Sequence, residues 1–149
     1  MNEINVKIKL VRQCSSVPEY ATAGSAAVDL RSAADSAITI EPHGRAVIPS
    51  GIAISPETSG VVAIIAARSG LSTKHGITLA NGIGVIDSDY RGEISVSLIN
   101  RSDVPYTIVP GDRIAQLMFV PVLHALFTQV PELDDTERGT GGFGSTGRN

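Results

Sequence analysis

The segment INVKIKL, residues 4 to 10, alternates apolar and polar side chains with a period of two. Its four aliphatic residues would face one way and its lysines the other, which predicts a half-buried β-strand. The same alternation returns at Glu93 to Leu98, where Ile94, Val96 and Leu98 are the apolar positions. Short β-branched runs lie between these two segments, at residues 37–40, 45–48, 52–54, 61–65 and 77–79.

Turn-forming sequences separate the predicted strands. They include Glu41-Pro42-His43-Gly44, Asn81-Gly82, Ser102-Asp103 and Val109-Pro110-Gly111-Asp112, the last with Pro and Gly placed for a type II turn. Many short strands with regular turns are typical of a sandwich, barrel or jelly roll. We expect a helix only at Ser69 to His75. The Ala-rich stretch Gly24 to Ala37 favours helix by propensity, but an isolated helix there would conflict with the surrounding pattern, so we predict a loop and a strand.

Length, charge and cysteine content narrow the class of protein. A chain of 149 residues fits one domain, and its formal charge of -3 argues against a nucleic-acid-binding surface. The lone Cys14 cannot form an intrachain disulfide. The longest apolar run, Val61 to Ala67, is too short to span a bilayer, and the N-terminus has no signal pattern. We therefore expect a cytoplasmic protein that binds neither nucleic acid nor membrane.

The composition changes near Asp134. Residues 138–148 read RGTGGFGSTGR, and such a glycine-rich segment cannot fold alone. We predict a folded domain at residues 1–133 and a flexible arm at 134–149. The arm's Gly139-x-Gly141-x-x-Gly144 matches the dinucleotide-binding pattern but lacks the strand and helix that the motif requires. Asn100-Arg101-Ser102 matches a glycosylation sequon, but nothing indicates secretion. The three histidines lack metal-ligand spacing, and we interpret each as a structural or surface residue.

Five separated motifs remain, and they carry the functional signal. They are GSAAVDL at 24–30, RSGLS at 68–72, GVIDSDYRG at 84–92, GDRIAQL at 111–117 and the arm at 138–147. In this order they closely resemble the trimeric dUTP pyrophosphatase family. The resemblance implies an all-β, jelly-roll-like fold with one short helix, and a homotrimer with three active sites shared between subunits. Ala27 and Val28 depart from the family, which commonly has Gly and an aromatic there.

The resemblance assigns the catalytic residues. Asp87 would be the general base that deprotonates the attacking water. Gln116 would reach the α-phosphate or that water, and Arg68 would offset charge on the leaving group. From the residues alone, Asp87 could be part of a polar turn and Gln116 a polar break in a buried strand.

The resemblance also assigns the substrate-binding residues. Tyr90 would pack on deoxyribose and exclude a 2′-hydroxyl, although a lone Tyr at a strand end is more often a core-edge residue. Uracil would be read by Asn81, in a hairpin leading to Asp87, and by the backbone of Gly84, Val85 and Ile86. The phosphates would be held by a larger set, with Phe143 stacking on uracil: Arg68, Ser69, Gly70, Arg138, Gly144, Ser145 and Thr146.

The expected cofactor is Mg²⁺, held mainly by phosphate oxygens and through water by Asp29. A plainer role for Asp29 is to cap or orient the nearby strand. The implied activity is hydrolysis of dUTP to dUMP and pyrophosphate, which keeps uracil out of DNA and supplies dUMP for thymidylate synthesis. Two alternatives stay open: a dCTP deaminase of the same fold, and a non-catalytic nucleotide-binding module.

Overall fold

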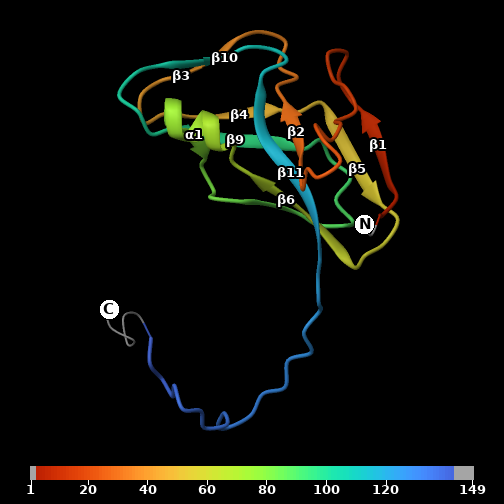
Figure 1. The fold of residues 1–149 in the computed structure, drawn as a ribbon, viewed down its shortest axis with the longest axis vertical. Helices are drawn as coiled ribbons and strands as arrows, with labels where there is room; N and C mark the ends of the chain where they lie inside the picture. Colours follow the sequence, from red (N-terminus) through yellow and green to blue (C-terminus); the bar gives the residue numbers. More distant parts are fainter. Residues whose placement is uncertain (1–2, 143–149) are drawn as a thin grey trace.

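The computed structural model describes residues 3–142, which form a β-rich body and an extended C-terminal segment (Figure 1). A four-stranded sheet has the order β2-β11-β6-β8, and a three-stranded sheet has the order β4-β9-β7. Their bounds are β2 Val28–Arg31, β11 Arg113–Pro121, β6 Val61–Ala66, β8 Gly84–Ile86, β4 Arg45–Pro49, β9 Ser95–Asn100 and β7 Ile77–Leu79. Every strand pair is antiparallel, as expected for a jelly-roll-like sandwich.

Two smaller strand pairs and one helix complete the body. β1 Val6–Leu10 pairs with β5 Ile52–Pro56, and β3 Ile38–Ile40 pairs with β10 Tyr106–Ile108. Helix α1 spans Ser69–His75, which confirms the single predicted helix. It ends at Gly76, whose φ of 70° is the left-handed conformation that closes helices. The Gly24 to Ala37 stretch contains β2 and no helix, as predicted.

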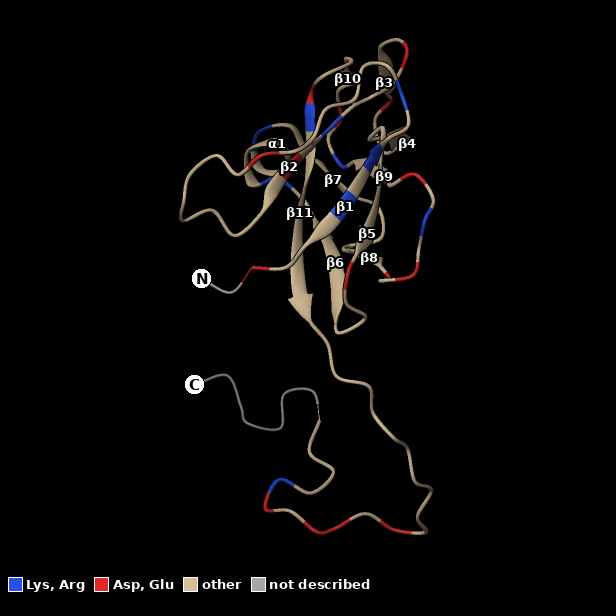
Figure 2. Ribbon diagram, turned by 90° about the vertical axis from the view of Figure 1, so that its right-hand side faces the viewer, with Lys and Arg blue, Asp and Glu red and all other residues tan. Residues whose placement is uncertain are grey.

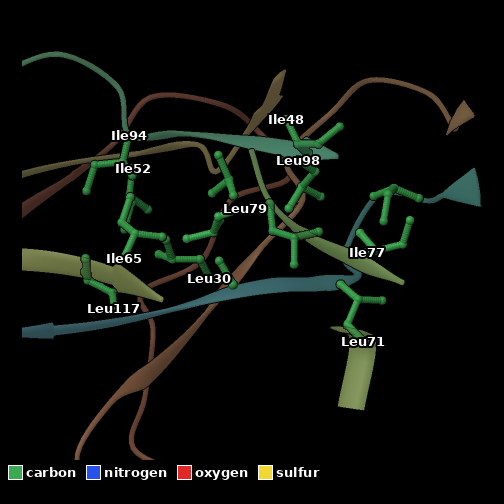
Figure 3. Close-up of a cluster of buried hydrophobic side chains, with 14 of the residues drawn as sticks. Leu30, Ile48, Ile52, Ile65, Leu71, Ile77, Leu79, Ile94, Leu98 and Leu117 are labelled. Atoms are coloured by element: carbon green, nitrogen blue, oxygen red, sulfur yellow. The ribbon is translucent and has the colours of Figure 1, made fainter. Parts of the chain in front are cut away.

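Aliphatic side chains from both sheets fill the space between them (Figure 3). Leu30, Ile65 and Leu117 come from the four-stranded sheet, while Ile48, Leu79 and Leu98 come from the three-stranded sheet, and each is at most 3% exposed. Burying one such side chain contributes about 1.5–3 kcal/mol. The core therefore fixes which face of each strand is left for polar residues.

The first strand is less buried than its alternation predicted. Ile4 lies before β1 and is 40% exposed, and Leu10 is 45% exposed, whereas Val6 and Ile8 are half-buried. The physical reason is that β1 pairs only with β5, so that Val6 and Ile8 pack against the core while Leu10 at the end of the strand does not. Alternation predicted the strand correctly, but not how much of its apolar face the chain covers.

The predicted turns are present in the structure. Gly111 has a φ of 88° and the Asp112 N–H donates to the Val109 carbonyl at 3.1 Å, which is the expected type II turn. The Asp112 carboxylate also accepts from the Val109 N–H at 2.8 Å. Asn100 of the apparent sequon is completely buried, and its side chain bonds to Ile40, Ser102 and Val104, so its role is structural.

The chain leaves the body after β11 (Figure 1). The Val122 N–H still donates to the Gly60 carbonyl at 3.0 Å, and residues 123–140 beyond it are exposed. Acidic residues are spaced along this segment (Figure 2), and so are bulky apolar ones: Leu123, Leu126, Phe127 and Leu133 are 88–99% exposed. The extended path begins at residue 122, twelve positions before the predicted start of the arm at residue 134. The boundary at residue 134 stays a prediction.

Candidate active site

A row of polar side chains crosses the outer face of the four-stranded sheet. Gln116 on β11 lies opposite Asp29 on β2 and opposite Ala66 on β6. The neighbours of Asp29 and Gln116 along their strands are Val28, Leu30, Ala115 and Leu117, all buried in the core. Because side chains alternate along a strand, Asp29 and Gln116 must point away from the core. Two of the predicted site residues are thus brought together by strand register.

Asp29 is held between two arginines, and we call Asp29, Arg68 and Arg113 the arginine cluster. Arg68 Nε donates to Asp29 Oδ1 at 2.9 Å, and Arg113 Nη1 donates to Asp29 Oδ2 at 3.3 Å. Arg68 Nη1 also donates to the Arg113 carbonyl at 3.3 Å. One carboxylate thus faces two guanidinium groups. The remaining positive charge suits an anionic ligand, because planar guanidinium groups bind phosphate through paired N–H donors.

Arg113 was missed by sequence reasoning, although it stands inside the quoted motif at 111–117. The signal that could have found it is its position three residues before Gln116 in that motif. A register shift between Arg113 and Ala115 separates Arg113 from the regular ladder with β2, and a bulge of this kind re-aims side chains. Its side chain is 50% exposed.

Arg68, Ser69 and Gly70 meet the cluster at the start of α1. Arg68 is the N-cap residue with extended backbone, and no side chain caps the helix. The first N–H groups of a helix have no partner within the helix. Ser69 and Gly70 are exposed, and open space surrounds the position a Gly70 Cβ would take. A phosphate oxygen can therefore approach the backbone here.

A neutral tyrosine lies near the cluster. Burial raises the pKa of the Tyr106 hydroxyl, and Asp112 raises it further, while Arg68 lowers it. The Tyr106 ring also contacts His75 at the end of α1, with ring centroids 4.9 Å apart. With its pKa above the ordinary value, Tyr106 stays protonated at neutral pH and adds no negative charge beside Arg68.

A cavity of about 510 Å³ adjoins the arginine cluster. The loop at residues 14–21 forms one wall, and Asp29, Arg31 and Arg113 contribute charged groups to the lining. Val28, one of the two departures from the family pattern, lies in the core at 7% exposure. An aliphatic residue at that position therefore packs inside and does not alter the direction in which Asp29 points.

Asp87 and Tyr90 lie in a separate turn directly after β8. The Tyr90 N–H donates to the Asp87 carbonyl at 3.1 Å, which closes the turn. The Tyr90 ring lies against Gly92, where a Cβ would come 2.3 Å from the Tyr90 hydroxyl, so a larger residue at position 92 would displace the ring. A cavity of about 260 Å³, called the turn pocket, is lined by Val85, Ile86, Asp87, Tyr90, Glu93, Ile94 and Ser95.

Glu93 is the second residue that sequence reasoning missed as part of a site. It appeared there only as a polar position of an alternating strand. In the structure it lines the turn pocket, and its carboxylate pairs with Arg12, at 2.6 Å between Arg12 Nε and Glu93 Oε1. The Arg12 hydrogen bond is the main reason that the pKa of Glu93 lies below its usual value. No sequence pattern links residues 81 positions apart.

The prediction of a hairpin at Asn81 is wrong, because the strands before and after Asn81 do not pair with each other. β7 pairs with β9 and β8 pairs with β6, so the chain crosses from one sheet to the other between Leu79 and Gly84. The turn itself is present, since Gly82 has a φ of 77° and the Ile83 N–H donates to the Asn81 carbonyl at 2.9 Å. Gly84 packs closely on β6, since a Cβ there would lie 2.9 Å from Ile65 Cβ.

Gln116 and Asp87 are far apart within one chain. Gln116 is paired with Ala66 of β6. Ile86 at the end of β8 is paired with Ala63 of β6, so the same register would place the next residue, Asp87, beside Val62, four positions from Ala66 along β6. That offset is about 13 Å along the strands, and two strand spacings add about 10 Å across them, giving roughly 16 Å. The arginine cluster and the turn pocket, which we call the two half-sites, therefore lie apart in one chain.

The described part of the arm includes only Arg138 among the predicted arm residues. Arg138 is exposed and its Nε donates to the Gly141 carbonyl at 3.0 Å. Phe143, Gly144, Ser145 and Thr146 lie outside the described residues. Their predicted contacts with substrate stay predictions.

The donor set limits how a metal could bind. Within residues 3–142, no group of three His, Cys, Asp or Glu side chains could hold a metal ion. Both oxygens of Asp29 already accept from arginines. These residues do not fit direct coordination by several protein ligands, but they do fit a hydrated cation held by phosphate oxygens, with Asp29 accepting hydrogen bonds from its waters.

Comparison with known proteins identifies the family. The family model described as dUTPase matches residues 13–147, and this chain belongs to that family. It is 52% identical to a deoxyuridine 5'-triphosphate nucleotidohydrolase of Desulfitobacterium hafniense, with 99% of each chain covered. The corresponding protein of Tolumonas auensis is 49% identical, again with 99% of each chain covered.

Solved structures agree with this membership. The dUTPase of Staphylococcus bacteriophage 80alpha with dUPNHPP has a TM-score of 0.88 and 29% identity, covering 97% of this chain and 99% of that chain. A mutant dUTPase from phage phi11 of S. aureus, described with a structural Mg(II) ion, has a TM-score of 0.79 and 25% identity, covering 88% and 99%. Within residues 3–142, no helix is long and apolar enough to cross a membrane.

Proposed function

We propose that this chain hydrolyses dUTP to dUMP and pyrophosphate. The observation that carries the proposal is the family match over residues 13–147, which includes both half-sites. Its relatives carry the name deoxyuridine 5'-triphosphate nucleotidohydrolase. In a cell this reaction would keep uracil out of DNA and supply dUMP for thymidylate synthesis. A cytoplasmic location stays a prediction.

Asp87 acts as the general base. Its carboxylate takes a proton from water while the water oxygen bonds to the α-phosphorus and the bond from that phosphorus to the bridging oxygen breaks, releasing pyrophosphate. Asp87 is exposed and lines the turn pocket, so both water and substrate can reach it. Gln116 orients the α-phosphate or the water, and Arg68 offsets charge that develops on the leaving group.

The turn pocket selects the nucleoside. Tyr90 is 45% exposed, and its ring presents an apolar surface on which a deoxyribose can pack. A 2′-hydroxyl would collide with that ring, so ribonucleotides are rejected by shape. Uracil is read by Asn81 and by the backbone of Gly84, Val85 and Ile86. Cytosine presents the opposite donor and acceptor pattern and would leave buried groups unpaired, which costs about 1–3 kcal/mol for each group.

The remaining binding residues hold the phosphates. Arg68, Ser69 and Gly70 supply a cation, a hydroxyl and backbone N–H groups at the start of α1. When bound, Mg²⁺ would neutralise phosphate charge and favour a reactive shape of the triphosphate, with Asp29 contacting its waters. The arm adds Arg138, Gly144, Ser145 and Thr146 at the phosphates and Phe143 on the uracil face.

Each complete site is formed between subunits of a homotrimer. The backbone separation of about 16 Å between Gln116 and Asp87 is longer than their two side chains together, which favours a site completed by another subunit. A second subunit that places its arginine cluster over the turn pocket would complete the site. The apolar side chains at 123–133 support the same assembly, since exposed groups of this kind need a partner surface.

One assay tests the proposal. Pyrophosphate release should be measured with dUTP, UTP, dCTP and dTTP, with and without magnesium, alongside ammonia release from dCTP. Pyrophosphate release from dUTP, and not from UTP, dCTP or dTTP, supports the proposal. Ammonia release from dCTP would identify a deaminase, and tight dUTP binding without turnover would identify a non-catalytic module.

A further inference from the structure

The Glu93 carboxylate receives three N–H donors beside the turn pocket. Arg12 binds it in a fork, with Nε 2.6 Å from Oε1 and Nη2 3.0 Å from Oε2. The Gly51 N–H donates to Oε1 at 2.9 Å. We call Arg12, Glu93 and Gly51 the carboxylate clamp. Charge-assisted, two-point hydrogen bonds of this kind fix direction as well as distance.

The other side of the clamp is anchored to the body. The Val11 N–H donates to the Gly51 carbonyl at 2.8 Å, and Ser15 Oγ donates to the Arg12 carbonyl at 2.6 Å. Gly51 has a φ of 74°, and a Cβ there would lie 2.4 Å from Ser15 Cβ and 2.7 Å from Ala33 Cβ. The backbone around Arg12 therefore packs too tightly to shift freely.

The clamp connects to Tyr90 through the backbone of Glu93. The Tyr90 hydroxyl donates to the Glu93 carbonyl at 3.2 Å, and the Tyr90 ring lies against Gly92. Beyond Glu93 the chain is fixed in the core, because Ile94 is completely buried and its N–H donates to the Ile52 carbonyl at 2.8 Å. The Glu93 carbonyl therefore holds the hydroxyl end of the Tyr90 side chain.

We propose that Arg12 is a positioning residue for sugar discrimination, acting through Glu93 to hold the Tyr90 ring at a fixed height over the sugar. This inference rests on the proposed dUTP hydrolysis. Excluding one hydroxyl requires the ring to be placed to within about the size of that group, whereas attack by water depends on Asp87 at the other end of the turn. Loosening the clamp therefore admits UTP before it disables Asp87.

The ionisation of Glu93 is consistent with this arrangement. The Arg12 hydrogen bond and the Gly51 N–H both lower the pKa of the Glu93 carboxyl, and their effect outweighs burial. Arg12 also lies 3.9 Å from Asp35, and Asp87 lines the same pocket as Glu93. The fork to Arg12 thus compensates the Glu93 charge close to a second carboxylate.

The test compares kcat/KM for dUTP and for UTP in the full chain with magnesium. Wild type, Arg12→Met, Glu93→Gln and the double variant are measured, with Arg12→Lys as the conservative variant. The ratio of kcat/KM for dUTP to kcat/KM for UTP is expected to fall about 10-fold in Arg12→Met and in Glu93→Gln. A fall of this size is within the roughly 10²-fold that a 1 Å misplacement can cost. The double variant should lose no more than either single one, because both residues act through one contact.

The control is Glu57→Gln, which breaks the exposed Lys7–Glu57 pair at 3.6 Å and should leave the ratio unchanged. Arg12→Lys keeps one charged contact and should keep part of the ratio. Melting temperatures show whether each variant is folded. An unchanged ratio in folded Glu93→Gln and Arg12→Met, or losses that multiply in the double variant, would overturn the inference. Wild type that releases no pyrophosphate from dUTP would instead refute the proposed function.

Discussion

Gln116 on β11 and Asp87 after β8 stand on the same sheet but about 16 Å apart, although both are assigned to one α-phosphate. This separation follows from register, since the two residues lie in rows four positions apart. In the proposed shared site, a neighbouring chain supplies the half-site that lies out of reach. The relationship leads directly to a test of the shared site.

Mixing two inactive variants should restore activity. Asp87→Asn subunits keep the arginine cluster and Gln116, while Gln116→Ala subunits keep the turn pocket. In randomly mixed trimers a site is complete when the subunit that supplies the turn pocket is Gln116→Ala and the subunit that supplies the arginine cluster is Asp87→Asn. Each condition holds with a probability of about one half, so about one quarter of the sites are complete. The variants are unfolded and refolded together at equal amounts, and pyrophosphate release from dUTP is measured.

The matched control mixes two lesions within the same half-site. Asp87→Asn with Tyr90→Ala leaves every turn pocket damaged, so no recovery is expected beyond the residual activity of each variant alone. Recovery in this control would mean that refolding, not complementation, restores activity. If the first mixture shows no recovery while sedimentation shows mixed trimers, each site lies within one chain.

Asp87→Asn alone should bind dUTP but turn it over slowly. Asparagine has nearly the same shape and cannot accept the proton, so kcat should fall by about 10²–10⁴-fold, the usual contribution of a general base. Asp87 is exposed, and so its replacement should leave the melting temperature close to that of wild type. Near-normal kcat would remove Asp87 from its assigned role.

Replacing Arg113 should weaken substrate binding with little effect on stability. Arg113→Met leaves Asp29 paired with Arg68 but removes one cation from the arginine cluster. We expect the KM for dUTP to rise about 10-fold, equivalent to about 1.4 kcal/mol. The melting temperature should change little, because the Arg113 side chain is 50% exposed and exposed ion pairs contribute little. Lys7→Ala removes an equal charge elsewhere and should leave KM unchanged.

Removing the arm should abolish turnover without dissociating the trimer. A chain ending before Arg138 loses every predicted arm contact, whereas the ordering of a glycine-rich segment contributes little to the fold. Phe143→Ala should cost less, about 1–3 kcal/mol, as for stacking of a base on an aromatic ring. Steady-state hydrolysis and sedimentation of the three proteins are compared. Undiminished activity in the truncated chain would show that the arm has no catalytic role.

Acid should destabilise the wild type more than Glu93→Gln. The folded-state pKa of Glu93 lies below the ordinary value of 4.5, so the ion pair with Arg12 stabilises the folded state above about pH 4.5. That contribution is lost as the pH falls through the folded-state pKa. Urea denaturation at several pH values from about 6 to 3 should show the two proteins converging in stability. A constant difference across this range would contradict the prediction.

Local sequence patterns predicted much of the fold. The alternation at 93–98, the helix at Ser69–His75 and the turn at Val109–Asp112 depend on neighbouring residues, and all three are present in the structure. The Ala-rich stretch at 24–37 was assigned correctly only because the pattern of the whole chain outweighed local propensity. Strand partners were less predictable, as Asn81 shows, because pairing depends on which sheet buries the next apolar side chain.

The candidate site divides in the same way. Motif order in the sequence determined the family and singled out Asp29, Asp87 and Gln116, because those motifs are contiguous residue patterns. Only the tertiary structure decided that Arg113 shares Asp29 with Arg68 and that Arg12 binds Glu93. The physical reason is that charge pairing acts over a few ångströms in space, whatever the separation along the chain, and only the folded arrangement of strands and loops brings such residues together.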